Sequence, residues 1–113
     1  MHEVSLAGGI LLVVEQARAR DPFVRVTHLR LQAGALAGVE CSALRFALES
    51  LAPGTVLEGA QIDIDEQPGT AWCLPCGKSV PVFSRLELCP LCEGAQLQVT
   101  GGTDLKVVDM RVV

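Results

Sequence analysis

Four cysteines fall in two tight pairs, and their spacing predicts a zinc site. The pairs are Cys73 with Cys76 and Cys89 with Cys92, and twelve residues separate them. A CxxC turn brings two thiolates to one ion, and a second turn completes a tetrahedron. Zinc accepts soft sulfur donors and imposes no geometry of its own, so a site of four thiolates is closed and structural rather than catalytic. Two disulfides would need an export signal, and a redox-active site would need only one pair.

The start of the chain is the second feature with metal chemistry, because the second residue is a histidine. The terminal amine of Met1 and the backbone nitrogen of His2 can close a five-membered chelate ring, and the near imidazole nitrogen of His2 can close a six-membered one. The backbone nitrogen or the side chain of Glu3 completes a planar set. Such tetragonal nitrogen ligation suits Ni(II) or Cu(II). A histidine near a chain start is more often simply solvated, so these residues alone leave both interpretations open.

The other candidate ligands favour structural roles. His28 lies in an expected strand, and Cys41 lies on the apolar stripe of an expected helix, where a free cysteine is usually a small core residue. Asp63 and Asp65 alternate with apolar residues along another expected strand and are expected to be solvated.

Composition bounds the class of protein. The chain has 113 residues, a net charge of −4 and no basic run, which disfavours a nucleic-acid binder. The longest apolar stretch, residues 6–14, is too short for a membrane span and contains a glycine pair, so no membrane contact is expected. No positively charged segment precedes it, so it is no secretory signal, and a cytoplasmic protein with reduced thiols is expected. The chain has no Ser/His/Asp set and no phosphate-binding loop, so no enzyme activity is expected.

Hydrophobic periodicity predicts the elements that position these residues. Helices are expected over 4–20 and 39–52, strands over 24–31, 59–67 and 105–112, and the zinc module over about 71–100. The expected buried stripes are Leu6, Ile10, Val13, Val14 and Ala17 in the first helix and Cys41, Leu44, Leu48 and Leu51 in the second.

The last strand is too short to be stable alone and should return to the main sheet. This order predicts an α+β fold in which two helices pack on a small three-stranded sheet that carries an inserted zinc-ribbon module. The expected domains are 1–69 plus 102–113, which contains the start of the chain, and 70–101, which would bind zinc.

Over its full length, the chain resembles the hydrogenase nickel-incorporation proteins of the HypA/HybF family. The start motif and both cysteine pairs carry the resemblance, and the matching stretches are 1–6, 29–48, 57–60, 68–73, 89–92 and 99–102. The resemblance implies a nickel metallochaperone in which Met1, His2 and Glu3 belong to the Ni(II) site. It also implies a structural Zn²⁺ held by Cys73, Cys76, Cys89 and Cys92.

The implied partners are a HypB-type GTPase and the large subunit of [NiFe]-hydrogenase, and some family members also serve urease through its accessory proteins. The alternative is a zinc-ribbon protein-interaction module that transports no metal. One position departs from the expected pattern: Gly77 follows Cys76, whereas Glu93 follows Cys92. A left-handed backbone at Glu93 would cost roughly 1–2 kcal/mol.

Overall fold

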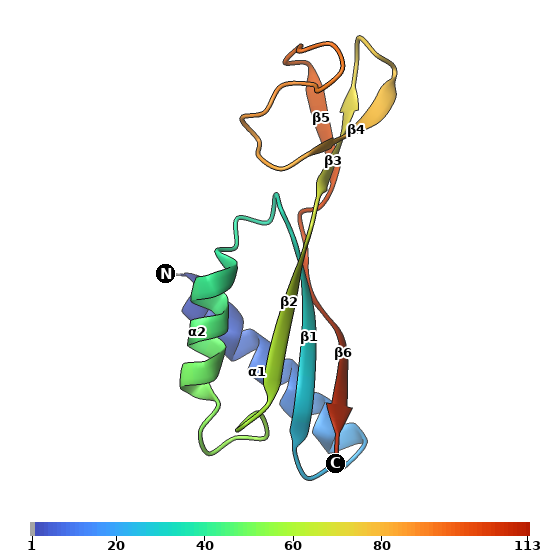
Figure 1. The fold of residues 1–113 in the computed structure, drawn as a ribbon. Helices are drawn as coiled ribbons and strands as arrows, with labels where there is room; N and C mark the ends of the chain where they lie inside the picture. Colours follow the sequence, from blue (N-terminus) through green and yellow to red (C-terminus); the bar gives the residue numbers. More distant parts are fainter. Residues whose placement is uncertain (1) are drawn as a thin grey trace. The chain divides into compact units, whose positions relative to one another are not determined.

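A computed structural model describes residues 2–113 of the chain, which fold into two helices and six strands within that range (Figure 1). The helices are α1 (His2–Arg20) and α2 (Cys41–Leu51). The strands are β1 (Val26–Gly34), β2 (Gln61–Gln67), β3 (Gly69–Cys73), β4 (Lys78–Val82), β5 (Leu97–Gly101) and β6 (Leu105–Val112). Neither helix is long and apolar enough to cross a membrane, as far as the described residues go.

The chain forms two compact units. Unit 1 comprises Met1–Leu31, Glu40–Asp65 and Val107–Val113, and unit 2 comprises Gln32–Val39 and Glu66–Lys106. The chain therefore passes between the units within β1, β2 and β6 and once more just before α2. The sequence predicted domains of 1–69 plus 102–113 and of 70–101. Those domains are defined as parts that fold and bind metal independently, which the compact units do not test, so the division remains a prediction.

Unit 1 contains both helices and most of a three-stranded sheet of order β2-β1-β6. Helix α1 crosses behind the strands in Figure 1 and packs against α2. The core is aliphatic, and its largest fully buried members include Val14 of α1, Leu29 and Leu31 of β1, and Leu44 and Leu48 of α2. The expected sheet with two packed helices is confirmed.

The helical stripes differ in detail from the expected ones. In α1 the buried face contains Ala7, Ile10 and Val14, whereas Val13 is 48% exposed, so its predicted burial was wrong. In α2 the buried residues are Leu44, Ala47 and Leu48, whereas Leu51 is 37% exposed. A helix in a small two-layer unit contacts the core along a narrow stripe, and apolar residues at its margins remain in solvent.

Helix α2 begins at an acidic cap. The Glu40 carboxylate accepts hydrogen bonds from the backbone N–H groups of Ser42 and Ala43, at 3.4 and 2.8 Å, and from the Ser42 hydroxyl. These bonds lower the pKa of the Glu40 carboxyl, with the Ser42 hydroxyl as the largest cause. A negative charge at this end also interacts favourably with the helix dipole.

Unit 2 contains a second three-stranded sheet, of order β4-β3-β5, in which β3 is antiparallel to both neighbours. Its small core combines Leu36, Ala71, Val80 and Val82 with the thiol side chains of Cys73 and Cys89. Two of the four expected zinc ligands are thus part of the apolar core of this unit. Zinc binding and packing therefore depend on the same few side chains.

Three glycines allow backbones to cross closely in unit 2. A Cβ atom on Gly34 would collide with the carbonyl group of Gly102, and one on Gly102 would collide with the backbone of Gly69. The crossing is hydrogen-bonded, because the N–H of Leu36 donates to the Gly102 oxygen at 2.9 Å. Gly102 also has a φ of +76°, which glycine adopts without strain.

Candidate metal centres

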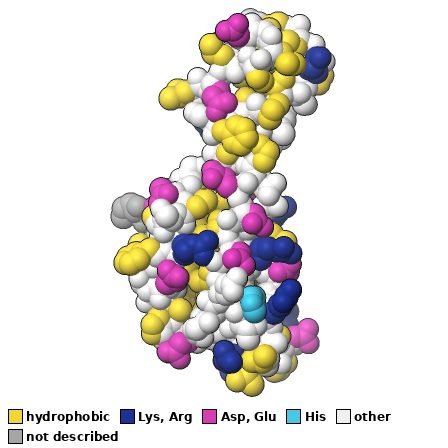
Figure 2. Space-filling model, in the orientation of Figure 1, with side chains coloured by type: hydrophobic (Ala, Val, Ile, Leu, Met, Phe, Trp, Pro, Cys, Tyr) yellow, Lys and Arg dark blue, Asp and Glu magenta, His cyan; other side chains and the backbone are white. Residues whose placement is uncertain are grey.

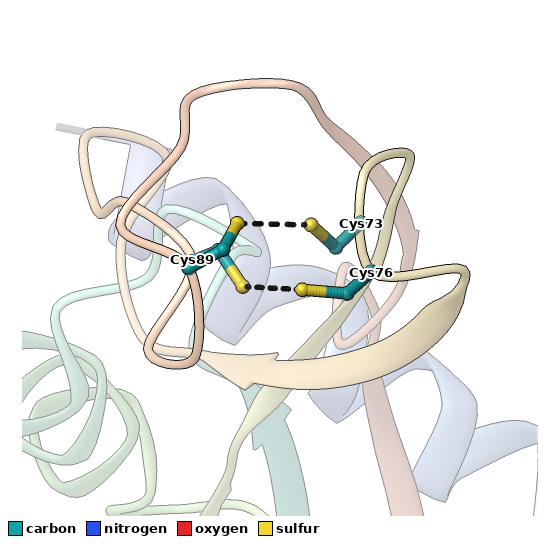
Figure 3. Close-up of side chains that lie close together, drawn as sticks. Cys73, Cys76 and Cys89 are labelled. Atoms are coloured by element: carbon teal, nitrogen blue, oxygen red, sulfur yellow. Dashed lines mark hydrogen bonds between the residues drawn. The ribbon is translucent and has the colours of Figure 1, made fainter.

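The four paired cysteines converge on one point in unit 2. Cys73 ends β3 and Cys76 lies in the turn before β4, whereas Cys89 and Cys92 lie in the loop between β4 and β5. One ligand atom from each residue lies within 4.8 Å of those of the other three. Figure 3 shows Cys73 and Cys76 on one side of the cluster and Cys89 on the other.

The sulfur spacing fits a tetrahedral zinc ion. The Sγ atoms of Cys73 and Cys92 lie 3.6 Å apart, and those of Cys76 and Cys89 lie 4.0 Å apart. Four sulfurs bound to zinc at about 2.3 Å would lie about 3.8 Å from one another, between these two distances. The four-cysteine cluster therefore fits a structural zinc, as its composition also indicates.

The two turns around the sulfurs have the same backbone design. In the first turn the N–H of Gly77 donates to the Cys73 carbonyl at 2.9 Å, and in the second the N–H of Glu93 donates to the Cys89 carbonyl at 2.8 Å. Both donors are left-handed, with φ of +62° for Gly77 and +60° for Glu93. The left-handed conformation that the sequence analysis considered for Glu93 is thus present. The backbone of Glu93 is strained there, because its Cβ atom lies too close to the following carbonyl oxygen.

Backbone donors and neighbouring thiols give the sulfurs different acidities. A hydrogen bond from the backbone N–H of Cys92, with a second from that of Leu91 at 3.4 Å, lowers the pKa of the Cys89 thiol to about 7. The adjacent Cys92 and Cys73 side chains raise the pKa of the Cys76 thiol to about 12. Four crowded thiols do not all ionise without a cation, so a divalent ion bound here would displace protons.

The residues at the start of the chain occupy different environments. The His2 side chain is 57% exposed, and its Nε2 atom lies 3.5 Å from Oε2 of Glu3. Glu3 is buried, with 8% of its surface accessible, and its Oε2 accepts a hydrogen bond from the backbone N–H of Glu40 at 3.3 Å. Met1 lies outside the described residues. The structure thus brings His2 and the Glu3 carboxylate together next to the first residues of α2.

Sequence reasoning missed the link between Glu3 and Glu40. The two residues are 37 positions apart in the sequence, and a hydrogen bond to a backbone N–H depends on tertiary packing rather than on side-chain type. A local indication did exist. Glu3 precedes Ala7, Ile10 and Val14 at helical spacing, so it lies on the buried face of α1.

The remaining candidate ligands belong to unit 1, whereas the thiol cluster belongs to unit 2. Nδ1 of His28 lies 3.1 Å from the Thr27 hydroxyl in a partly buried position, which agrees with a structural histidine. Cys41 is partly buried at the first position of α2. Among residues 2–113, the four paired cysteines are the one group of three or more ligating side chains close enough to share an ion.

Comparison with known proteins identifies the family. The family described as "Hydrogenase/urease nickel incorporation, metallochaperone, hypA" matches residues 1–112. The chain belongs to the HypA family. It is 57% identical over 112 residues to the hydrogenase maturation factor HypA of Cupriavidus necator, covering 99% of this chain and 94% of the relative. It is 56% identical over 112 residues to that of Polaromonas naphthalenivorans, covering 99% and 97%.

Solved structures of HypA proteins share the fold. The solution structure of the nickel metallochaperone HypA from Helicobacter pylori aligns with a TM-score of 0.70 over 100% of this chain and 98% of that one, at 16% identity. A second HypA solution structure aligns with a TM-score of 0.69 over 100% and 97%, at 17% identity. The fold of this HypA-family chain therefore agrees with structures whose sequences have diverged widely from it.

Proposed function

We propose that this chain carries Ni(II) for the maturation of hydrogenase and binds the ion at its N-terminus. One observation carries the proposal: the HypA family matches residues 1–112, a stretch that includes both the Met1-His2-Glu3 start and the four-cysteine cluster. The nickel is cargo, so the site must select the ion and also release it. A site at the start of a helix, beside the largely exposed His2 side chain, suits release, because few groups must reorganise when a partner takes the ion.

In the proposed site the two nitrogens of the His2 ring have separate tasks. Nδ1, the terminal amine of Met1 and the backbone nitrogen of His2 would hold the nickel, and Glu3 would supply a further ligand. The first N–H groups of a helix are not used by its own hydrogen-bond ladder, so these backbone nitrogens lie where ligation does not break the helix. The distance from Nε2 of His2 to the Glu3 carboxylate, 3.5 Å, supports a further role for that carboxylate. It orients the ring and makes it a better donor, as carboxylates do for other metal-bound histidines.

The proposed zinc ligands are Cys73, Cys76, Cys89 and Cys92. A closed four-thiolate site leaves no position for substrate, so zinc would stabilise the fold of unit 2 and would not act on a reactant. The proposal therefore assigns no enzyme activity to the chain.

The proposed partners are those that the family resemblance implies. They are a HypB-type GTPase and the large subunit of [NiFe]-hydrogenase, with urease accessory proteins as a further recipient route. A cytoplasmic location is part of the proposal, because the four thiols of the zinc site need a compartment that keeps them reduced.

Calorimetric titration of Ni(II) into the zinc-loaded protein tests the proposal. The native chain is expected to bind one nickel tightly, and a chain with one extra residue before Met1 is expected to lose that binding. His2→Ala should also lose it but keep the zinc and the helical circular dichroism. His28→Ala is the matched control, because it removes the other histidine from a strand of unit 1. Equal nickel binding by the native and extended chains would place the ion elsewhere and refute the terminal site.

The alternative function is a zinc module that binds a partner protein and transports no metal. Several large apolar side chains on unit 2 favour it, because Leu86 is 92% exposed, Leu91 is 61% exposed and Phe83 is 59% exposed. The same titration separates the two functions. No nickel bound by either the native or the extended chain would leave the interaction module as the better account.

A further inference from the structure

Solvent reaches the four paired cysteines of unit 2 unequally. Cys73 and Cys89 lie in the apolar core of the unit, with 0% and 1% of their surfaces accessible. Cys76 is partly buried, and Cys92 is the one exposed member of the cluster. The reactivity of a cysteine toward a dissolved reagent depends on its exposure, so Cys92 is the sulfur that such a reagent meets first.

The backbone around Cys92 keeps its sulfur accessible. A Cβ atom on Gly94 would lie 3.3 Å from the Sγ atom of Cys92, so the missing side chain leaves the space beside this sulfur open. Leu91 and Glu93, the chain neighbours of Cys92, are themselves exposed. Glu93 also has the strained left-handed backbone, whereas a glycine holds the equivalent position in the first turn. The second turn is therefore the part of the cluster that is easiest to open.

A second thiol lies within reach of the exposed one. The Sγ atom of Cys73 is 3.6 Å from that of Cys92, so a movement of about 1.5 Å would bring the two sulfurs to bonding distance. Cys73 ends a paired strand in the core, whereas Cys92 lies in the loop between β4 and β5, so the movement falls to Cys92. An exposed thiol beside a second thiol that can resolve it is the arrangement of cysteines that respond to oxidants.

We propose that Cys92 is an oxidation site at which hydrogen peroxide opens the four-cysteine centre. The Cys92 thiolate attacks one oxygen of the peroxide, the O–O bond breaks, and the products are a sulfenic acid on Cys92 and a hydroxide ion. The Cys73 thiolate then attacks the Cys92 sulfur, and a second hydroxide leaves as the Cys73–Cys92 disulfide forms. The peroxide gains the two electrons that the two thiolates lose.

The disulfide would remove two of the four sulfur donors, and this consequence rests on the zinc ligands proposed above. Cys76 and Cys89 alone do not complete a tetrahedral site, so zinc is released. Figure 2 shows mostly hydrophobic and uncharged side chains on the visible face of unit 2, a surface that suits a small uncharged oxidant better than a charged one. Oxidation at one exposed sulfur thus reaches a site whose other ligands form part of the core.

Release of zinc from the full-length, zinc-loaded protein tests the proposal. A chelating dye reports the released ion after hydrogen peroxide is added, and the zinc content beforehand tests the ligand assignment separately. Gly94→Ala places a methyl group against the Cys92 sulfur and should slow the release by about threefold or more. Cys41→Ser is the matched control, because it removes the remaining cysteine, which belongs to unit 1, and should leave the rate unchanged. Equal rates for the wild type and a zinc-loaded Gly94→Ala would overturn the proposal.

Mapping of the oxidised cysteine needs no variant. Dimedone traps sulfenic acids, so brief peroxide treatment with dimedone, followed by peptide mass spectrometry, should place the adduct on Cys92 at about tenfold or more above any other cysteine. Without dimedone, the first disulfide should join Cys73 to Cys92. A main adduct on any other cysteine would contradict the proposal, and so would a first disulfide within Cys73–Cys76 or within Cys89–Cys92. Zinc-loaded protein that forms none of these products in excess peroxide would also refute it, while leaving the zinc assignment intact.

Discussion

Replacing Gly102 by alanine should test whether the backbone crossing in unit 2 is as tight as the structure indicates. The substitution acts in two ways. At a φ of +76° an L side chain is strained by roughly 1–2 kcal/mol. The new Cβ would also collide with the backbone of Gly69, which cannot rotate away, and such overpacking costs roughly 1–3 kcal/mol. Together these effects predict a loss of roughly 2–5 kcal/mol in the free energy of unfolding of unit 2.

Two further variants separate these contributions. Gly38 has a φ of +72° but open space around its Cβ position, so Gly38→Ala should lose only the strain, roughly 1–2 kcal/mol. Gly34 lacks a positive φ but is blocked by the Gly102 carbonyl, so Gly34→Ala should lose only the overpacking, roughly 1–3 kcal/mol. All three positions belong to unit 2. The smaller entropy of the unfolded chain with alanine is common to the three variants and cancels in the comparison.

The assay is urea unfolding of the zinc-loaded protein followed by tryptophan fluorescence. Trp72 is the single tryptophan of the chain and lies in β3, so the fluorescence reports unit 2 rather than the average over both units. Equal zinc content in all variants is the control for loss of metal. If Gly102→Ala and Gly38→Ala cost the same within about 0.5 kcal/mol, the crossing is not tightly packed and the reasoning is wrong.

Three further predictions follow from the zinc turns and from helix α1. In urea titration, Glu93→Gly should raise the free energy of unfolding of unit 2 by up to about 1 kcal/mol, because it relieves left-handed strain. Gly77→Glu introduces the same strain and should lower this free energy by roughly 1–2 kcal/mol. Effects of equal sign would contradict this reasoning. Zinc affinity, measured by competition with a chelating dye, should fall as the pH falls. The plot of log affinity against pH should steepen by about one decade per pH unit below the pKa of Cys89, about 7, because one more thiol must then lose its proton on binding. An unchanged slope across pH 7 would count against the assigned acidity. Val14→Ala should cost roughly 1.5–3 kcal/mol in thermal unfolding and Val13→Ala under about 0.5 kcal/mol, because their exposures are 1% and 48%; similar costs would mean that the buried face of α1 is misplaced.

Local patterns predicted the parts of the molecule in which near neighbours decide the structure. The spacing within Cys73–Cys76 and Cys89–Cys92 brings each pair to one ion without help from distant residues, and the alternation along 105–112 matches β6 at both ends. The glycine pair Gly8-Gly9 did not prevent α1, because both positions are exposed while Ala7, Ile10 and Val14 pack into the core. Packing of one face outweighs a propensity cost of about 1 kcal/mol per glycine.

By itself, the sequence determined the candidate ligands: four cysteines at zinc spacing and a histidine at the second position. Only the tertiary structure decided the surroundings of those ligands. It buries Glu3 against the N–H of Glu40, turns Gly102 into a contact point between backbones, and leaves β6 at the rim of its sheet. The reason is physical. Ligand type is a property of single residues at short spacing, whereas burial, close approach and strand order arise from contacts between segments that lie far apart along the chain.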